Sequence, residues 1–353
     1  MNMKLYDNSN YIDDLTYVAN LPLPWDQLKG RSILISGATG LVGSFLTDVL
    51  MLKNQEGLSC HIYALSRNAE RAAGRFCRWS GDEHLEFISY DINKPFVRDD
   101  LEQVDYILHL ASNTHPMQYS TDPIGTITTN IIGLQNMLEF ACAHQAVRFA
   151  FASSNEIYGE NRGDTEMFRE DYCGYINCNT MRAGYPESKR CGEALCQAYK
   201  AQKGLDVVIP RLTRSYGPTM LMSDTKAISQ FIRKGVAGED IVLKSAGTQY
   251  YSYTYVADAV SGLLTVLLKG ESGEAYNIAD EASDIMLKDL AAIIAATAGK
   301  KVVFELPDAV EAAGYSTATK ARLDGEKLKK LGWKPRYDME SGLARTISIL
   351  KSM

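Results

Sequence analysis

Arg31-Ser-Ile-Leu-Ile-Ser36, followed by Gly37-Ala-Thr-Gly40-Leu-Val-Gly43, is the stretch that decides the fold of this chain. The first run is short and apolar, which predicts a buried strand, and the apolar periodicity of residues 41–52 predicts a helix directly after the glycines. Glycines are needed there if the backbone turns tightly, packs helix against strand and approaches a pyrophosphate closely. The free N–H groups and positive dipole end of the helix would then hold the phosphates. The turn therefore predicts a dinucleotide site; the alternative is a tight turn without a ligand.

Strands and helices continue to alternate after this turn. Apolar runs predict strands at residues 61–65, 85–89, 106–110, 148–152 and 207–210, and apolar periodicity predicts helices at 128–144 and 185–203. This alternation is typical of parallel β-α-β units, so we expect the α/β class, with a Rossmann-type doubly wound parallel sheet and a smaller C-terminal α/β substrate lobe. The expected division is an N-terminal extension (1–30), an NAD(P)-binding Rossmann domain (31–215, with a returning segment near 252–272) and a substrate lobe (216–251 and 273–353).

The composition excludes several other classes of protein. Of the 353 residues, 46% are hydrophobic and 23% charged, which is ordinary for a globular protein, and the net charge of -6 argues against nucleic acid as a partner. No apolar run approaches the length of a membrane span, and residues 1–10 lack the pattern of an export signal. The seven cysteines and five histidines lack the spacing of a metal site, so we expect reduced thiols, no metal and a cytoplasmic location.

Tyr185-Pro-Glu-Ser-Lys189 predicts a catalytic pair. The phenol and the ammonium are four residues apart and so share one face of a helix. A tyrosine with its ordinary pKa of about 10 is a poor base at neutral pH. A nearby lysine and a positive nicotinamide ring would lower that pKa, so that the phenolate could remove a hydroxyl proton while the carbon loses a hydride. The alternative is an ordinary helix face.

Ser153-Ser-Asn-Glu-Ile-Tyr-Gly159 follows the predicted strand that ends at Ala152. The carboxyl end of a strand in an α/β sheet faces the ligand. Ser154 could therefore hydrogen-bond the reacting hydroxyl, and Glu156 could act as an acid or base on a neighbouring carbon. The alternative is a polar transition from strand to loop.

The glycine spacing resembles that of the extended short-chain dehydrogenase/reductase superfamily. Asp91-Ile92 resembles its adenine-contacting pair, His109-Leu-Ala-Ser112 resembles the segment beneath its cofactor, and Asn130 opens the long helix as the asparagine of that superfamily does. By this resemblance the cofactor is NAD and its expected contacts are Gly37, Thr39, Gly40, Leu41, Val42, Gly43, Ser66, Arg67, Asp91, Ile92, Leu110, Ala111, Ser112, Asn130, Tyr185 and Lys189.

One position leaves NADP open. The acidic residue that usually binds the ribose about twenty residues beyond the glycines is not evident, and Ser66-Arg67 follows the second strand instead. Arg67 could pair with a 2′-phosphate and favour NADP, or it could be a solvated surface arginine.

From Ile33 onward the chain resembles the nucleotide-sugar epimerase/dehydratase family, and within it the UDP-glucuronate decarboxylases. The similar segments include Tyr172-Cys-Gly-Tyr-Ile-Asn177, Arg182-Ala-Gly-Tyr185, Tyr216-Gly-Pro-Thr-Met220, Tyr255-Val-Ala-Asp258 and Leu331-Gly-Trp333. The resemblance implies catalysis by Ser154, Glu156, Tyr185 and Lys189, a transient ketone at C4 of the sugar and a homodimer. It implies substrate contacts by Tyr119, Asn155, Glu156, Arg214, Lys226 and Tyr251.

The chain departs from the decarboxylase pattern at several arginines. Tyr251, Thr219 and Lys226 stand where those enzymes carry arginine, and Arg214 stands where they carry asparagine. Tyrosine and threonine cannot replace the planar cationic fork of arginine, so the substrate could lack a carboxylate or carry another nucleotide, unless Arg214 has taken over some positive charge. Asn155 replaces the acid that dehydratases carry, which disfavours dehydration.

Several alternatives stay open. Tyr250, Tyr251, Tyr253 and Tyr255 could stack on a nucleobase, but their alternation is more typical of a strand with an aromatic face. The chain could be a 4-epimerase or dehydratase, a non-catalytic NAD(P)-sensing module, or a simple carbonyl reductase that consumes NADPH.

Overall fold

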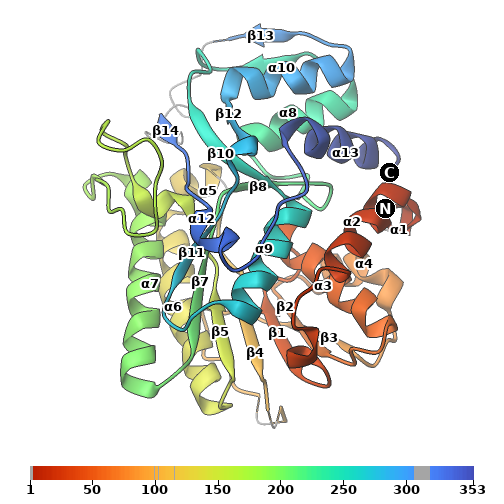
Figure 1. Cartoon of the computed structure of the whole chain (residues 1–353), viewed down its shortest axis with the longest axis vertical. Helices are drawn as coiled ribbons and strands as arrows, with labels where there is room; N and C mark the ends of the chain where they lie inside the picture. Colours follow the sequence, from red (N-terminus) through yellow and green to blue (C-terminus); the bar gives the residue numbers. More distant parts are fainter. Residues whose placement is uncertain (1–2, 99, 102, 115, 306–318) are drawn as a thin grey trace.

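The main sheet is parallel and its strands follow the order β11-β7-β5-β4-β1-β2-β3, with β6 also pairing with β7 (Figure 1). The computed structural model describes residues 3–98, 100–101, 103–114, 116–305 and 319–353. The strands of this sheet are β1 (Ser32–Ser36), β2 (His61–Ser66), β3 (Leu85–Ser89), β4 (Tyr106–His109), β5 (Arg148–Phe151), β6 (Ser153–Ser154), β7 (Val207–Leu212) and β11 (Ala275–Ile278). Every pairing among them is parallel, which confirms the Rossmann-type α/β sheet.

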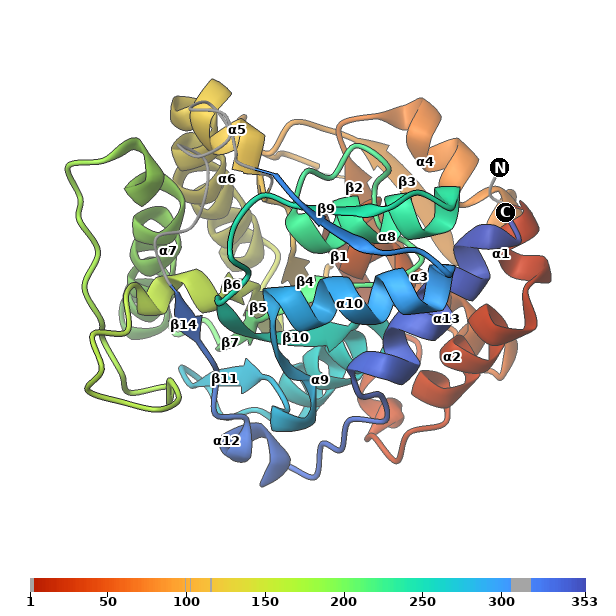
Figure 2. The ribbon, with the colours of Figure 1, turned by 90° about the horizontal axis from the view of Figure 1, so that it is seen from above.

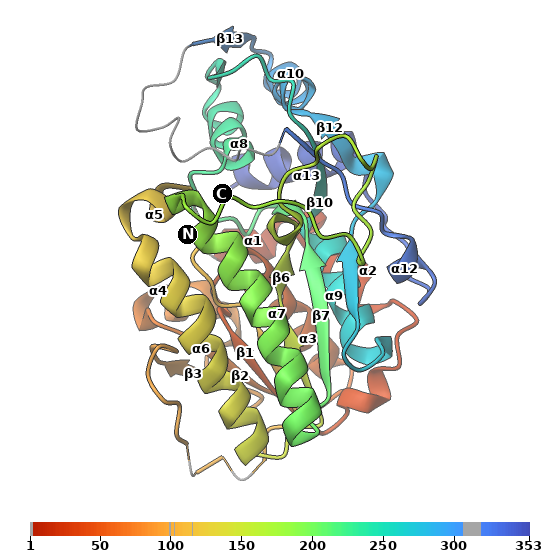
Figure 3. The same cartoon turned by 90° about the vertical axis from the view of Figure 1, so that its left-hand side faces the viewer.

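Helices cover both faces of the sheet. On one face α6 (Pro123–Ala143) and α7 (Gly184–Lys203) lie side by side, and their Leu134, Met137 and Cys196 pack against sheet residues such as Phe149 (Figure 3). On the other face the larger core contains Phe45 of α3 (Leu41–Gln55) and Leu264 of α9 (Val256–Lys269). α4 (Ala69–Arg75) follows β2, and α5 (Pro116–Thr121) precedes α6.

The long helix predicted at residues 128–144 begins earlier than expected. α6 starts at Pro123, and the side chain of Asp122 caps it by accepting a hydrogen bond from the Gly125 amide at 3.0 Å. Proline in the first turn and aspartate at the N-cap are both favourable helix starts. Asn130 is therefore the eighth residue of the helix, and the prediction that it opens the helix is wrong.

A smaller lobe stands over the carboxyl ends of the strands. It contains α8 (Ala227–Ala237), α10 (Leu287–Ala298), β8 (Arg214–Tyr216), β9 (Ile241–Leu243), β10 (Tyr250–Tyr255), β12 (Asp284–Met286), β13 (Val302–Phe304) and β14 (Lys320–Ala321). Seen from above, α8 and α10 lie side by side across the strand ends (Figure 2). Residues 306–318, which fall in the predicted lobe segment 273–353, lie outside the described residues.

Two strands lie on the other side of the boundaries that the sequence suggested. β11 falls within the predicted lobe segment 273–353, yet it pairs with β7 in the main sheet, with Ala275 opposite Ile209. β8 begins within the predicted Rossmann segment 31–215 and pairs with Tyr253–Tyr255 of the predicted returning segment 252–272, yet both strands belong to the lobe sheet that contains β12 and β14. The chain therefore passes between the Rossmann domain and the lobe more often than the boundaries predicted from the sequence indicate.

The N-terminal segment is built into the core. In α1 (Met3–Asp7) and α2 (Ser9–Ala19), Tyr11 and Leu15 are buried against the Rossmann core. Asn8 donates a hydrogen bond at 2.7 Å to Ser352, just after α13 (Met339–Lys351), so the two ends of the chain lie together. A short helix, α12 (Glu326–Lys329), precedes α13. The segment is more than an appended extension.

A buried polar network ties this segment to the Rossmann domain. The carboxylate of Asp48 on α3 accepts hydrogen bonds from Tyr6 (2.7 Å), Tyr11 (2.5 Å) and Trp79 (2.8 Å) and pairs with Arg75 at 2.5 Å. Asp48 is fully buried, so each of these contacts compensates for its lost hydration.

The described residues were also compared with what a membrane span and a metal site require. None of the helices among them is long and apolar enough to cross a membrane. Nor do three or more His, Cys, Asp or Glu side chains in that part of the chain gather as potential ligands for a metal ion.

Replacing Asp48 by alanine should lower the free energy of unfolding by about 3–5 kcal/mol, because it leaves the Arg75 charge buried without its counter-ion. The measurement is chemical denaturation at neutral pH. Glu56→Ala, which breaks the surface pair with Lys53, is the control and should cost less than about 1 kcal/mol. Similar losses for the two variants would contradict a special role for the Asp48 network.

Candidate active site

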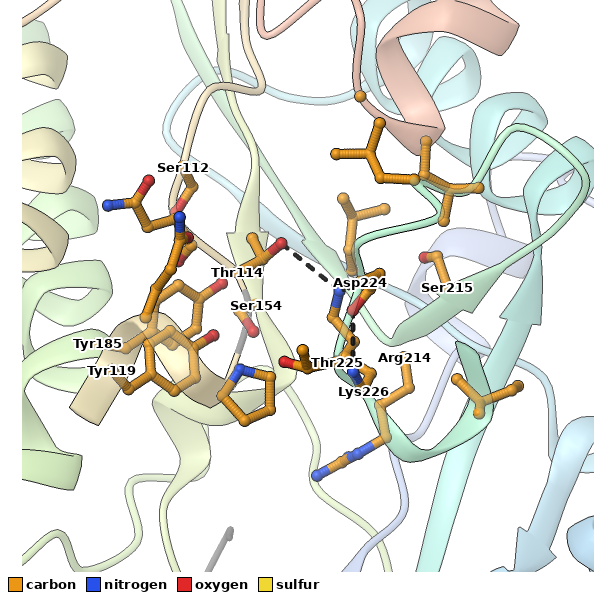
Figure 4. A pocket seen from close by; sticks show the side chains of 18 of the residues that line it. Ser112, Thr114, Tyr119, Ser154, Tyr185, Arg214, Ser215, Asp224, Thr225 and Lys226 are labelled. Atoms are coloured by element: carbon orange, nitrogen blue, oxygen red, sulfur yellow. Dashed lines mark hydrogen bonds and ion pairs between the residues drawn. The ribbon is translucent and has the colours of Figure 1, made fainter. Parts of the chain in front are cut away.

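A cavity of about 1150 Å³ lies between the carboxyl ends of the main-sheet strands and the lobe. With the exception of Asn130, it is lined by every residue that the sequence analysis proposed for cofactor, substrate or catalysis. The figure of the site shows Tyr119 and Tyr185 on one side and Arg214 and Lys226 on the other, with Ser154 between them (Figure 4). Residues far apart in the sequence thus meet in one cavity.

The glycine turn is packed too tightly for side chains. Gly37 has a positive φ of 74°, and a Cβ added there would lie 2.8 Å from the backbone nitrogen of Ala111. A Cβ at Gly43 would lie 2.5 Å from the carbonyl oxygen of Gly37. No side chain caps α3 at Gly40, so the amides of its first turn are available to a ligand in the cavity. This geometry fits a pyrophosphate at a helix N-terminus.

The end of β2 adds positive charge beside the turn. Thr39 and Ser66 hydrogen-bond through their hydroxyls at 2.8 Å, and Arg71 of α4 donates to Thr39 at 2.9 Å. Arg67 is exposed and also lines the cavity. Burial, reinforced by Arg67, lowers the pKa of Arg71. The sequence analysis missed Arg71, which lies four residues beyond Arg67 and whose partner is 32 residues away.

Asn130 does not line the cavity, although the sequence analysis placed it among the cofactor contacts. It is fully buried, accepts a hydrogen bond from Ser112 at 2.7 Å and donates one to Ser188 at 2.9 Å. Asn130 therefore holds Ser112, which does line the cavity, from behind.

Tyr185 and Lys189 project from the first turns of α7 and are only 6% and 3% exposed. Burial and the nearby carboxylate of Glu156 raise the pKa of Tyr185 to about 12, while hydrogen bonds to Ser154 and Ser112 and the charge of Arg182 lower it. The sequence analysis expected Lys189 to lower the pKa of Tyr185, but burial and Glu156, which raise this pKa, have the larger effect.

The Lys189 ammonium is occupied by neighbours other than the phenol. It donates to the Ala152 carbonyl at 2.8 Å and lies 4.7 Å from the centre of the Phe151 ring. Burial lowers its pKa to about 7. Lys189 therefore changes charge near neutral pH, where its proton can respond to what binds beside it.

Glu156 is held by an arginine that the sequence analysis did not include among the site residues. One terminal nitrogen of Arg182 lies 2.7 and 2.6 Å from the two carboxylate oxygens of Glu156. The same guanidinium lies 4.7 Å from the centre of the Tyr119 ring, which in turn stacks on Tyr185 at 4.9 Å. Because the partners are 26 residues apart, only the Arg182-Ala-Gly-Tyr185 segment pointed to this arginine in the sequence.

The far side of the cavity carries the remaining predicted substrate contacts. Lys226 pairs with Asp224 at 2.8 Å, and the guanidinium of Arg214 lies 3.6 Å from the centre of the Tyr251 ring. Asn155 is buried just before Glu156.

The tyrosine-rich segment is a strand with an aromatic face, as its alternation predicted. In β10, Tyr251, Tyr253 and Tyr255 share one face and are 6%, 2% and 1% exposed. Tyr255 donates to Asp14 of α2 at 2.6 Å, so this end of the face belongs to the core. Tyr251 and Tyr253, by contrast, line the cavity.

Known proteins resemble this chain in sequence and in structure. Residues 33–279 match the model of the NAD dependent epimerase/dehydratase family. The chain is 33% identical over 320 residues to UDP-glucuronic acid decarboxylase 1 of Danio rerio, which covers 90% of this chain and 72% of that protein. It is 32% identical to UDP-glucuronic acid decarboxylase 5 of Arabidopsis thaliana, over 88% of this chain and 86% of that one.

Among solved structures, the fold is similar to that of a double mutant of the dTDP-glucose 4,6-dehydratase of Streptomyces venezuelae with NAD bound. The TM-score is 0.78 at 25% identity, over 90% of this chain and 96% of that one. Since the family model spans well over half of the sequence, this chain belongs to the NAD-dependent epimerase/dehydratase family and is an enzyme that uses NAD.

Proposed function

We propose that this enzyme oxidises C4 of the sugar of a nucleotide-sugar for part of its cycle, and that decarboxylation of a UDP-hexuronate is its leading reaction. The observation that carries the proposal is the meeting of Ser154, Glu156, Tyr185 and Lys189 in the cavity that also contains the glycine turn. The similarity to UDP-glucuronic acid decarboxylases over about nine-tenths of the chain supports the choice of reaction.

The glycine turn, the first turn of α3 and Ser112 would hold the cofactor, together with Arg67 after β2 and Arg71 of α4. When bound there, NAD would supply reversible hydride transfer, so that none is consumed overall. Tyr185 takes the proton of the C4 hydroxyl as the base. Ser154, which hydrogen-bonds Tyr185, holds that hydroxyl in line and favours the phenolate.

The product depends on what the 4-ketone does next. If C5 carries a carboxylate, the ketone is a β-keto acid, and the electrons of the broken C5–carboxylate bond pass into an enolate as carbon dioxide leaves. Glu156, held by Arg182, is placed to exchange a proton with this part of the sugar. Dehydration is disfavoured because Asn155 cannot donate a proton as an acid. Epimerisation at C4 is the second candidate, since it needs only the same oxidation and return.

The purified enzyme should convert UDP-glucuronate with loss of carbon dioxide, and Tyr185→Phe should lower turnover by about 10²–10⁴-fold because the base is gone. Mass spectrometry of the products and a count of bound NAD are the measurements. Tyr199→Phe, which alters a tyrosine farther along α7 that hydrogen-bonds Glu139, is the control and should keep near-normal turnover.

UDP-glucuronate that stays intact after incubation with the NAD-loaded enzyme would contradict the decarboxylase assignment. Full activity in Tyr185→Phe would contradict the role of Tyr185 as the base.

Ser154→Ala should move the acid limb of the pH profile of kcat/KM to higher pH. The hydrogen bond of Ser154 lowers the pKa of Tyr185, so its loss raises that pKa, and a base is active only above its pKa. Ser153→Ala is a matched control, because its hydroxyl makes no hydrogen bond to the described part of the chain. If the acid limb of the profile did not move in Ser154→Ala, or moved equally in both variants, Ser154 would not be the group that lowers the pKa of Tyr185.

We also propose that two copies of the chain associate through α5, α6 and the short turn Met181–Ala183 that precedes α7. This surface exposes an unusual set of large apolar side chains for a globular protein: Met117 (40%), Ile124 (75%), Ile127 (37%), Ile132 (43%) and Met181 (63%). Apolar side chains gathered in this way typically mark an interface.

The double substitution Ile124→Glu/Ile132→Glu should convert the dimer into a monomer in sedimentation velocity, because two buried charges would oppose association. Phe304→Glu, at an equally exposed apolar residue in β13 of the lobe, serves as the control and should remain dimeric. A wild-type monomer at micromolar concentration, or a double variant that stays dimeric, would refute this interface.

A further inference from the structure

Arg214 is a half-buried arginine of the cavity whose guanidinium forms no hydrogen bond or ion pair with the described residues. One of its terminal nitrogens, Nη1, is buried and makes no hydrogen bond to that part of the chain. Arg182 also has a buried nitrogen, Nε, without a hydrogen-bond partner, but its charge is paired with Glu156. Arg71 donates to Thr39, and Arg233 donates to the carbonyl of Asp224. Proteins rarely leave a buried donor of a charged group without an acceptor, so a ligand is the natural partner.

The position of Arg214 is fixed in advance of binding. Its backbone belongs to β8, which pairs with β10 so that Arg214 lies opposite Tyr253. Its guanidinium covers the Tyr251 ring at 3.6 Å. An arginine stacked on an aromatic face keeps its N–H groups, which lie in the plane of the guanidinium, free for a planar anion such as a carboxylate.

This guanidinium lies near the side of the cavity that carries Ser154 and Glu156. Leu212, two residues before Arg214, pairs with the catalytic Ser154 where β7 meets β6. Burial raises the pKa of Tyr251, and the charges of Arg214, Glu156 and Arg182 all act on it. The Arg214–Tyr251 pair is therefore within electrostatic reach of the Glu156–Arg182 pair.

The balance of charge there favours an anion. The charge of Glu156 is matched by Arg182, and that of Lys226 by Asp224. A carboxylate brought next to Glu156 would meet repulsion unless a further cation were present. Arg214 supplies that cation, across the cavity from Tyr119 and Tyr185 (Figure 4).

We propose that Arg214, stacked on Tyr251, determines specificity by binding the carboxylate of a hexuronic acid carried on a nucleotide. The proposal rests on the proposed function in one respect, since it assumes that the sugar occupies this cavity. It adds the group that distinguishes an acidic sugar from a neutral one. The diphosphate of the nucleotide is the other anion that could reach Arg214, and the experiment separates the two.

The test measures binding by isothermal titration calorimetry to NAD-loaded protein in the Tyr185→Phe background, where turnover does not interfere. The probes are UDP-glucuronate, UDP-glucose and UDP. Arg214→Gln should weaken binding of UDP-glucuronate by about 10- to 100-fold and leave UDP-glucose and UDP within about 3-fold, since it removes one charge-assisted contact. Arg214→Lys keeps the charge without the planar fork, so its affinity for UDP-glucuronate should lie between that of the parent protein and that of Arg214→Gln.

Arg162→Gln is a matched control, because Arg162 is an exposed arginine that stacks on Tyr175 at 3.9 Å outside the cavity. It should change none of the three affinities. Equal weakening of all three probes by Arg214→Gln would assign the arginine to the diphosphate and overturn the proposal. So would unchanged binding, or parent protein that shows no preference for UDP-glucuronate over UDP-glucose.

Failure of this proposal is distinguishable from failure of the proposed function. Protein with Tyr185 intact that decarboxylates UDP-glucuronate, together with unchanged binding in Arg214→Gln, would leave the function standing and remove Arg214 from it. If Arg214→Gln selectively lost UDP-glucuronate binding but protein with Tyr185 intact showed no turnover, the role of Arg214 would stand and the proposed reaction would fail.

Discussion

The close approach of the glycine turn to the end of β4 is the constraint on which the rest of the site depends. Gly37 lies so near the backbone of Ala111 that no side chain fits between them, and Gly43 lies equally close to Gly37. This packing brings the N-terminus of α3 to the carboxyl edge of the sheet. The ends of the parallel strands β1, β4 and β6 face the same cavity, so the cofactor turn and the catalytic serine are neighbours by topology.

Burial sets the electrostatics of the reacting groups. It raises the pKa of Tyr185 to about 12 and lowers that of Lys189 to about 7, in both cases against the charged form. Hydrogen bonds from Ser154 and Ser112 and the charge of Arg182 oppose this effect on the phenol. The chain alone therefore keeps its base protonated at neutral pH, and positive charge bound beside the phenol is what would release the proton.

Local patterns predicted the parts of the fold and site that depend on neighbours in sequence. The glycine turn, the alternation of strands and helices, and the Tyr185–Lys189 spacing on one helical face all appear where they were expected. β11 was misplaced because its pairing with β7 depends on residues more than sixty positions earlier in the chain. The embedding of α1 and α2 likewise depends on Asp48 and Arg75, whose partnership with Tyr6 and Tyr11 no local periodicity reveals.

The same distinction holds within the site. Arg182 and Arg71 were not included among the site residues because they meet their partners, Glu156 and Thr39, only in the folded chain. Asn130 was assigned to the cofactor by its resemblance to the asparagine of the superfamily, whereas its side chain hydrogen-bonds Ser112 and Ser188 behind the cavity wall. A motif identifies which residues matter more reliably than it identifies what each one touches.

The most direct test of the central claim is to follow the C4 hydrogen of the substrate. UDP-glucuronate deuterated at C4 should give a decarboxylated UDP-pentose that keeps the deuterium at C4, because the hydride removed from that carbon is returned to it. Nuclear magnetic resonance and mass spectrometry of the product make the measurement. Decarboxylated UDP-pentose with hydrogen at C4 would contradict oxidation and return within one closed site.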